Sequence, residues 1–290
     1  MCVVLVNYRN WSDTCLCVQS LRRQSHAVDS IVVVNNDPLD PPPTSSDLLG
    51  VEIVAASANV GFGAACNVGA RRARERGATV IWFLNNDAEA EPSALEQLLN
   101  AHGSAGEDFG AAVSLIVFER DPDVVQWSTS NVLPLAAGVS VHGDEPIAEW
   151  RERAPTRVTF APGCSLFMEA ARFEELGGFA EQYFMYFEDV DLSLRIVRAG
   201  RSIWLVPSSV VRHKGGASGG GIWSRFGSFL YSRNRIWVAR RFGVPGISAI
   251  LATFLQLVWL AKRWSLRHPM HWKESIRGIV AGFVRLPSSS

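Results

Sequence analysis

A short polar run, Asn85-Asn86-Asp87, directly follows the apolar residues Val80 to Leu84. This is the pattern of a buried parallel strand that ends by placing polar groups at the carboxyl edge of a sheet, where open α/β sheets bind ligands. A carboxylate at that edge can hold a hard divalent cation, and such a cation can neutralise a diphosphate. The alternative is that Asp87 is an ordinary residue of an Asn-Asn-Asp turn.

Two earlier apolar runs end in the same way. Val3 to Val6 is followed by Asn7 and Tyr8, and Ile31 to Val34 is followed by Asn35-Asn36-Asp37. Because the carboxyl ends of parallel strands meet at one edge of a sheet, these side chains are expected to line a common edge. A buried core edge has no need of so many amides and carboxylates, so the repetition predicts a binding site.

A second group of acids follows the aromatic cluster Tyr183 to Phe187. Glu188, Asp189 and Asp191 open a predicted helix. Carboxylates beside aromatic side chains are partly desolvated, which raises their pKa and suits a general base. Acids in a first helical turn also favour the helix dipole without any function, and Asp191 is spaced to pair with Arg195 one turn later.

Two further features are ambiguous from spacing alone. His213 ends a strand beside paired glycines and is a candidate metal ligand, although a single histidine is more often a packing or surface residue. The segment from Asn59 to Gly69 is dense in glycine but matches neither G-x-G-x-x-G nor a Walker loop. Its backbone could approach a sugar nucleotide closely, or it could form a tight turn with close helix packing at Gly69.

Strands that alternate with helices must position these residues, which predicts an α/β fold with a mostly parallel sheet and right-handed crossovers. Residues 134–155 are expected to form a loop to which no role is assigned. The expected strands cover residues 2–6, 30–34, 51–54, 80–84, 111–118, 158–168 around a Pro-Gly bend, 203–206 and 210–211. The expected helices run from a cap at Ser12 or Asp13 to Arg23, over 65–73, from Pro92 to Leu99, and over 170–176, 188–200 and 231–241.

Composition is that of a well-cored globular protein. The 290 residues are 48% hydrophobic and 19% charged, enough for one large domain or two small ones. The five cysteines are scattered with no CxxC spacing, which supports neither a zinc site nor a disulfide framework, and favours small buried side chains in a reducing compartment. No secretory signal is expected at the N-terminus.

Charge is distributed unevenly along the chain. Residues 201–290 carry fourteen Lys or Arg and one acid, Glu274, giving 14 − 1 = +13, whereas the first 200 residues give 14 − 27 = −13. Within this tail, Gly246 to Ala261 is nearly all apolar but shorter than the ~20 residues of a spanning helix. An amphipathic basic stretch follows, and Trp259, Trp264 and Trp272 suit an interfacial helix. The tail therefore predicts attachment to an anionic membrane surface; a core-capping helix or an oligomer contact is the alternative.

In their order and spacing, these motifs make residues 1–242 resemble a family-2 glycosyltransferase of the GT-A fold, most similar to the bacterial rhamnosyltransferase group. The resemblance implies a nucleotide-sugar-binding half at 1–105 and an acceptor-binding and catalytic half at 106–242. The residues of the tail predict C-terminal amphipathic helices at 243–290. The stretches that carry it are Val6-Asn7-Tyr8, Val34-Asn35-Asn36, Asn59 to Gly63 with Asn67 and Gly69, Leu84 to Asp87, Gly177-Gly178-Phe179, Tyr186 to Leu192 with Arg195, and His213 to Gly216.

The resemblance also implies roles for individual residues. Asp189 would be the general base, paired with Glu188, and Asp87 with His213 would bind Mg²⁺ or Mn²⁺. The nucleotide sugar would contact Asn7, Tyr8, Asn35, Asn36, Asp37, Asn59, Gly61, Asn67, Asn85 and Asn86. The acceptor or the diphosphate would contact Asp191, Arg195, Arg233 and Asn234. Two positions depart from the family pattern: Asn35-Asn36 replaces Asp-Asn, and Asn85 replaces the first acid of the DxD motif.

The implied reaction is a single inverting displacement that moves a sugar to a hydroxyl of a glycan acceptor. The resemblance favours rhamnose from dTDP-rhamnose, and UDP-hexoses or their N-acetyl forms are the alternative donors. The acceptor is expected to be polyprenyl-linked, with the enzyme peripheral on the cytoplasmic face of the cell membrane in envelope polysaccharide synthesis. No nucleic-acid partner is expected, and a homo-oligomer is open. The alternatives are a sugar nucleotidyltransferase and a noncatalytic sugar-nucleotide-binding protein.

Overall fold

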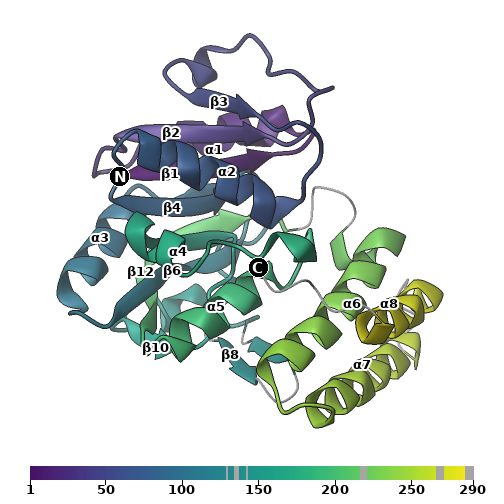
Figure 1. Ribbon diagram of the computed structural model, residues 1–290. Coiled ribbons are helices and arrows are strands. Elements are labelled where there is room, and N and C mark those ends of the chain that lie inside the picture. The colour runs from purple at the N-terminus through teal and green to yellow at the C-terminus, as the bar shows by residue number, and fades with distance from the viewer. Residues whose placement is uncertain (129, 134–136, 142, 216–220, 266–270, 285–290) are drawn as a thin grey trace.

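One mixed sheet forms the centre of the computed structural model, which describes residues 1–128, 130–133, 137–141, 143–215, 221–265 and 271–284 (Figure 1). Within those residues the sheet has ten strands, with the order β10-β12-β6-β11-β4-β1-β2-β3 and with β5 and β7 paired to β12 and β6. Strands β3, β2, β1 and β4 are parallel, as are β6 and β12. Antiparallel β11 joins the two parallel groups, so the predicted halves 1–105 and 106–242 share one sheet.

The strands follow the apolar runs of the sequence. They are β1 (Cys2–Asn7), β2 (Ser30–Asn35), β3 (Glu52–Ala55), β4 (Val80–Asn85), β5 (Ala88–Ala90), β6 (Phe109–Phe118), β7 (Val125–Trp127), β8 (Ser130–Leu133), β9 (Gly138–Val141), β10 (Thr156–Val158), β11 (Ser165–Glu169) and β12 (Ser202–His213). The α-helices are α1 (Trp11–Arg22), α2 (Phe62–Glu75), α3 (Ala94–Ser104), α4 (Ala170–Glu175), α5 (Glu188–Arg198), α6 (Arg225–Phe242), α7 (Ile247–Ser265) and α8 (Trp272–Val284).

Both faces of the sheet are covered, which is why its central strands read as continuous apolar runs. Val4 and Phe83 face the core under α2, α4 and α5, whereas Leu5 and Trp82 face the core under α1 and α3. Helix α2 approaches β1 so closely that a Cβ at Gly69 would lie 2.3 Å from a methyl group of Val4. Close helix packing therefore accounts for Gly69.

Most of the predicted elements are present, with differences at their ends. Helix α1 is capped by Asn10, whose side chain accepts from the Asp13 backbone N–H, so the expectation of a cap at Ser12 or Asp13 was wrong. Strand β5 was not expected, and part of the predicted 134–155 loop forms β9. The two short strands expected near 203 and 210 are one strand, β12, with an irregularity between Val206 and Val210.

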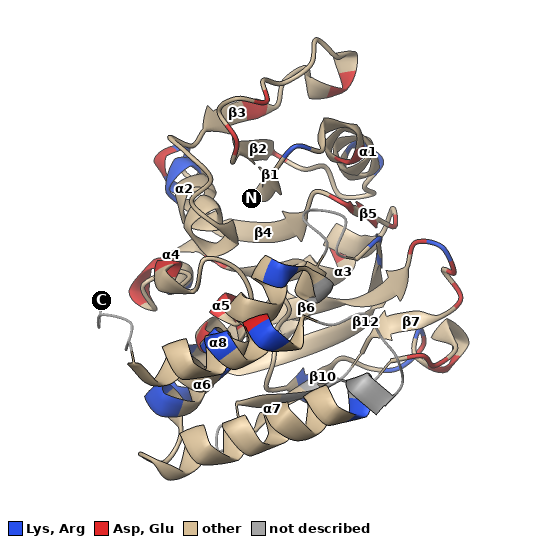
Figure 2. Ribbon diagram, turned by 90° about the vertical axis from the view of Figure 1, so that its right-hand side faces the viewer, with Lys and Arg blue, Asp and Glu red and all other residues tan. Residues whose placement is uncertain are grey.

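The C-terminal part is a three-helix unit in which α7 and α8 both pack on α6 (Figure 1). Helix α6 begins at Arg225, six residues earlier than expected. Lys and Arg colour parts of α6, α7 and α8 in Figure 2, in agreement with the basic tail. Within the described part of the chain, every helix is too short or too polar to cross a bilayer. The side chain of Trp264 and all of 285–290 lie outside the described residues.

Candidate active site

A cavity of about 510 Å³ lies beyond the carboxyl ends of β1, β2 and β4, where the sequence predicted a site. It is walled on its other side by the segment 184–189, which leads into α5, and by the start of α6. The predicted site residues that line it are Tyr8, Asn36, Asn59, Gly61, Asn85, Asn86, Asp87, Glu188, Asp189 and His213. The fold thus brings both predicted acidic groups and the predicted histidine to one space.

Asp87 and His213 form a pair in this cavity. A carboxylate oxygen of Asp87 lies 3.3 Å from Nε2 of His213, and both side chains are largely buried. Nδ1 of the ring lies 3.0 Å from the amide oxygen of Gln126, which favours a proton on Nδ1. The Asn85 amide nitrogen lies 3.1 Å from Nε2, in position to donate to it. The imidazole is therefore held from one side so that its other nitrogen faces the carboxylate.

Strand pairing accounts for this meeting of residues 126 positions apart in the sequence. The short strand β5 follows Asp87 immediately and pairs antiparallel with the end of β12, in the register His213 to Ala88. The backbone N–H of Lys214 also donates to the Asp87 carbonyl at 3.1 Å. His213 is therefore positioned by main-chain hydrogen bonds as well as by its ring contacts.

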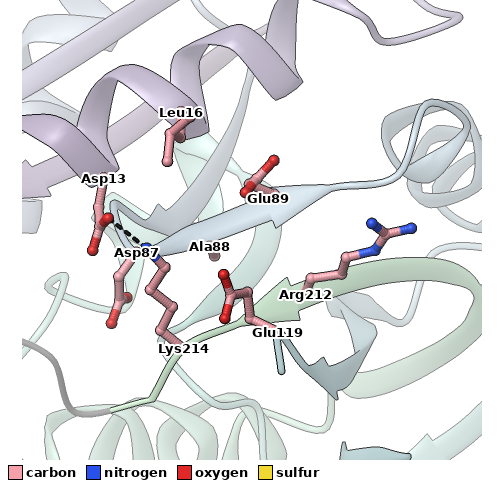
Figure 3. Close-up of a pocket in the computed structure, with 8 residues that line it drawn as sticks. All are labelled: Asp13, Leu16, Asp87, Ala88, Glu89, Glu119, Arg212 and Lys214. Carbon is pink, nitrogen blue, oxygen red and sulfur yellow. Dashed lines mark hydrogen bonds and ion pairs between the residues drawn. The ribbon is translucent and has the colours of Figure 1, made fainter. Parts of the chain in front are cut away.

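Behind Asp87 the site is closed by an ion pair between α1 and the end of β12. Lys214 Nζ lies 2.6 Å from a carboxylate oxygen of Asp13 (Figure 3). Both residues line a small surface pocket together with Glu89 and Glu119. The hydrogen bond from Lys214 to Asp13 raises the pKa of Lys214. Figure 3 shows the Lys214 side chain directed at Asp13, so this ion pair ties the strand that carries His213 to α1.

Asp189 is the candidate general base at the opposite wall. Its carboxylate is half-buried and accepts hydrogen bonds from the backbone N–H groups of Gly163 at 3.1 Å and Val190 at 2.8 Å. Burial raises the pKa of Asp189, and the hydrogen bond from Gly163 opposes that effect. The result is a fixed carboxylate that binds a proton more readily than an exposed aspartate does.

Glu188 lies beside Asp189 in a drier position. It is 5% exposed, and Oε2 has no hydrogen-bond partner among the residues that the structure describes. Burial raises the pKa of Glu188 well above its usual value, and the neighbouring charge of Asp189 adds to the effect. Of the two carboxyls, Glu188 has its pKa raised further by burial and so favours its protonated form more strongly than Asp189 does.

The backbone that delivers this pair is strained. Phe184, Tyr186 and Phe187 have φ values of 67°, 68° and 71°, in a region that side chains other than glycine rarely adopt. Phe187 is the N-cap residue that directly precedes α5. The Phe184 carbonyl also accepts a hydrogen bond from the Phe62 N–H at 2.7 Å, and a Cβ at Gly61 would lie 2.2 Å from that oxygen. Gly61 is therefore required for the approach of the two cavity walls.

Residues of α6 hold the strained loop. The fully buried amide of Asn234 donates to the backbone carbonyls of Tyr183, Met185 and Tyr186 at 3.0, 2.9 and 2.8 Å. Arg233 donates to the Tyr183 carbonyl at 3.0 Å, and burial lowers its pKa to about 10. Neither side chain lines the cavity, and these contacts place both behind the loop that forms its wall.

Three residues predicted to contact the nucleotide sugar do not line the cavity and instead stabilise the carboxyl edge of the sheet. Asn7 is fully buried and accepts from Thr14 Oγ1 at 2.9 Å. Asn35 donates to the Asp40 carbonyl at 2.9 Å. Asp37 forms an ion pair with Arg9, whose hydrogen bond lowers the pKa of this carboxyl. These side chains order the loops that follow β1 and β2.

Three further predicted residues hold other elements together. Asn67 on α2 makes two bonds to the backbone of Phe179, donating to its carbonyl at 2.8 Å and accepting from its N–H at 2.9 Å. Asp191 is fully buried and accepts from Tyr183, Arg195 and Arg241 at 3.0, 2.6 and 3.0 Å. Arg195 also donates to the Gly178 carbonyl at 2.8 Å. The structure does not bring Asn67, Asp191 or Arg195 to the cavity.

Sequence reasoning missed three residues that shape the site. Gln126 orients the His213 ring, but it reaches the site through the pairing of β7 with β6, for which the sequence holds no local signal. Gly163, which donates to Asp189, lies in the Pro-Gly bend that the sequence did indicate, and the bend could have been read as a site feature. Phe226 at the start of α6 is 54% exposed and lines the cavity.

Comparison with known proteins places this geometry in a family. The sequence profile of the glycosyl transferase family 2 matches residues 2–172. An N-acetylglucosaminyl-diphospho-decaprenol L-rhamnosyltransferase, found in two strains of Mycobacterium tuberculosis, is 27% identical over 213 residues, which cover 66% of this chain and 68% of the relative.

Solved structures share the fold at lower sequence identity. GalNAc-T7 with UDP, GalNAc and Mn²⁺ matches with a TM-score of 0.64 and 16% identity, over 97% of this chain and 56% of that one. Residues 1–349 of S. aureus TarS match with a TM-score of 0.56 and 14% identity, over 97% of this chain and 80% of that 1–349 chain. The chain thus spans little more than half of the GalNAc-T7 chain, and these two likenesses concern the fold alone.

Proposed function

The chain belongs to glycosyltransferase family 2, and on that premise we propose that it moves a sugar from a nucleoside diphosphate donor to a hydroxyl of a glycan acceptor. One observation carries the proposal: Asp189 lines the same cavity as Asp87 and His213. This arrangement supplies a proton acceptor at one wall and ligands for a diphosphate-bound cation at the other.

The donor side of the cavity is the edge formed by β1, β2 and β4. Tyr8 offers an aromatic face for a base, and the Asn36 amide is fixed by its bonds to Asn59 Oδ1 and the Val60 N–H, at 3.1 and 3.0 Å. With Asn36 held in this way, the loop 59–61 keeps its backbone at the cavity wall. We assign the nucleotide to this edge.

Asp87 and His213 fit a divalent cation. With Nδ1 protonated toward Gln126, Nε2 carries a lone pair and lies 3.3 Å from an oxygen of Asp87. A cation bound by Nε2 would take the place of the hydrogen bond from Asn85. Two electron-pair donors so placed are suited to sharing one cation, and the mixed carboxylate–imidazole set favours Mn²⁺ over Mg²⁺. A cation bound there would neutralise the charge on the departing diphosphate.

Asp189 performs the proton transfer in the proposed step. The acceptor hydroxyl gives its proton to the Asp189 carboxylate as its oxygen forms a bond to the anomeric carbon. The bond from that carbon to the diphosphate oxygen breaks, and its electron pair leaves with the nucleoside diphosphate. A single displacement of this kind inverts the anomeric centre and needs no second carboxylate as nucleophile. The hydrogen bond from Gly163 keeps the carboxylate aimed while it gains the proton.

For the substrates, the name of the mycobacterial relative describes rhamnosyl transfer to a lipid-linked N-acetylglucosamine. We propose the same class of reaction here, with dTDP-rhamnose as the donor and a polyprenyl-diphosphate glycan as the acceptor in envelope polysaccharide synthesis. The rim of the cavity supports a sugar acceptor, because Phe184, Tyr186 and Phe226 present aromatic surface on which a pyranose ring can stack.

The test is product analysis of the purified protein with a panel of nucleotide sugars, Mn²⁺ and a short acceptor. A glycosyltransferase releases nucleoside diphosphate and forms a glycosylated acceptor, with dTDP-rhamnose expected to give the fastest release. Release of pyrophosphate would identify a nucleotidyltransferase instead. Donor binding without any product would identify a binding protein, and the assignment of Asp189 as a base would be wrong.

A further inference from the structure

Helix α7 carries most of its large apolar side chains on its exposed face, which is unusual for a helix whose outer face contacts only water. Its buried residues on the side of α6 are small or polar, with Leu260 at the end: Ser248, Ala249, Ala252, Gln256 and Leu260. The half-buried Trp259 also contacts α6. The opposite face is exposed and bears Ile247, Ile250, Phe254, Leu257 and Val258, which are 43% to 67% exposed. A surface helix of a globular protein shows the reverse arrangement.

Helix α8 has the same inverted pattern. Its inner face contains Gly278 and Gly282, spaced four residues apart, where α6 comes so close that a Cβ at Gly278 would lie 2.3 Å from the Phe229 carbonyl. Its outer face bears Trp272, Ile276, Val280 and Phe283, which are 37% to 56% exposed. Small residues between helices and large apolar ones outside are characteristic of helices whose surroundings are lipid.

We infer that the outer faces of α7 and α8 are inserted together into the boundary between headgroups and acyl chains of an anionic membrane. Below, the membrane face means Ile247, Ile250, Phe254, Leu257 and Val258 of α7 with Trp272, Ile276, Val280 and Phe283 of α8. Insertion is in the plane of the membrane, since neither helix can span it. This inference does not depend on the transfer reaction.

Charge identifies the occupant as an anionic lipid surface. The segment 201–290 has fourteen bases against one acid, Glu274. Lys273 and Arg277 are exposed on α8, each directly after a residue of the outer face in the sequence, and they flank that face. Each base near an anionic surface adds about 1 kcal/mol of attraction, and apolar burial adds to it. A second copy of this face would instead bring like charges together.

The membrane face is connected to the cavity through aromatic contacts. Trp259 of α7 stacks on Tyr231 of α6 at 6.1 Å between ring centres, and Tyr231 meets Phe187 at 5.0 Å. Phe187 directly precedes Glu188 and Asp189. The same helical unit therefore carries the membrane face and holds the loop at the acceptor wall, which would keep the cavity close to lipid.

The test is cosedimentation of the full chain with vesicles at physiological salt. Wild-type protein is expected to bind vesicles containing phosphatidylglycerol, and to bind pure phosphatidylcholine vesicles at least about tenfold more weakly. The double variant Ile250→Asn/Phe254→Asn should lower the partition coefficient at least about 100-fold, because two large apolar groups no longer leave water. Both side chains are exposed, so the melting temperature should change little.

A matched control places the same change elsewhere. Leu39 and Leu49 are 86% and 72% exposed in the segment between β2 and β3, and Leu39→Asn/Leu49→Asn should bind vesicles like the wild type. Wild-type protein that ignores phosphatidylglycerol vesicles overturns the inference, as does equal binding by the α7 variant. A wild-type dimer in solution that becomes monomeric in the α7 variant, with vesicle binding unchanged, would assign the face to a second copy.

Discussion

The side-chain amide of Asn234 donates to the backbone carbonyl of Tyr186 at 2.8 Å, two residues before Glu188. The same nitrogen reaches the carbonyls of Tyr183 and Met185, so one buried amide holds most of the aromatic loop. Because Tyr186 has a φ of 68°, this backbone keeps its shape only where its surroundings impose it. Asn234 therefore acts as a positioning residue for the carboxyls that follow.

Replacing Asn234 should disturb catalysis more than donor binding. Asn234→Ala removes the donor to three carbonyls, and a small shift of Asp189 is expected to lower kcat by about 10²-fold. The donor contacts lie on the other wall, so the dissociation constant for the nucleotide sugar should stay within about twofold. Steady-state kinetics and calorimetric titration with the donor give the two values.

Gln256 provides the control for Asn234. Gln256 lies on α7 and is also a buried amide. It donates to Ser232 of α6 at 3.2 Å and makes no hydrogen bond to the aromatic loop that Asn234 holds. Losing buried hydrogen bonds costs roughly 1–3 kcal/mol in either variant. If Gln256→Ala loses as much kcat as Asn234→Ala at equal stability, the effect is general loosening of the helices and the positioning role is wrong.

Gly61 gives a second test, of the contact between the cavity walls. Gly61→Ala places a Cβ 2.2 Å from the Phe184 carbonyl, whereas Gly77→Ala at a similar φ of +81° meets nothing within 4 Å. Gly77→Ala should cost about 1–2 kcal/mol of backbone strain. The clash at Gly61 should add roughly 1–3 kcal/mol to the same strain and weaken donor binding. Urea unfolding of both variants measures the difference, and equal losses would contradict the contact.

Much of the site could be predicted because its residues follow strands directly. Asn36 and Asp87 come at the ends of β2 and β4, and parallel pairing alone brings those ends to one edge. Glu188 and Asp189 were identifiable from local pattern, as acids between an aromatic cluster and a helix. These predictions needed only periodicity and the rule that parallel strands share an edge.

Other features depend on pairings that no local pattern reveals. Gln126 reaches His213 only because β7 pairs with β6 and β6 with β12. Asn234 and Arg233 were predicted to contact the acceptor or diphosphate, and the structure shows them bonded to carbonyls of the loop before Glu188. No local pattern reveals that this loop has three positive φ values. The inverted faces of α7 and α8 likewise became readable only once α6 defined their inner side.

Glu188 predicts a pH-dependent change in stability. Its pKa is raised in the fold, so the folded state keeps a proton that the unfolded chain releases above about pH 4.5, and stability from this group falls as pH rises. Glu188→Gln resembles the protonated form at every pH. The variant should therefore match the wild type near pH 4 and be more stable at pH 7 to 8. Thermal melts across this range measure it, and a variant that is less stable at pH 8 would show that Glu188 is ionised in the fold.

Asp87 and His213, as the proposed cation ligands, predict how the metal preference of the protein changes when either is replaced. His213→Ala should weaken Mn²⁺ binding more than Mg²⁺ binding, because imidazole is a ligand for transition metals rather than for Mg²⁺. Asp87→Ala should weaken both. Electron paramagnetic resonance of free Mn²⁺, with the nucleoside diphosphate present, reports binding without turnover. Lys273→Ala on α8 serves as the control. Unchanged Mn²⁺ affinity in Asp87→Ala would show that Asp87 and His213 are not the cation site.

The role of Asp189 as general base can be tested with Asp189→Asn. The amide keeps the size of the side chain but cannot take a proton from the acceptor hydroxyl. With the donor and acceptor that the wild type uses, kcat should fall by about 10²–10⁴-fold. The dissociation constant for the nucleotide sugar, measured on the same sample, should stay within about twofold. Turnover near the wild-type rate with donor binding intact would show that Asp189 is not the general base.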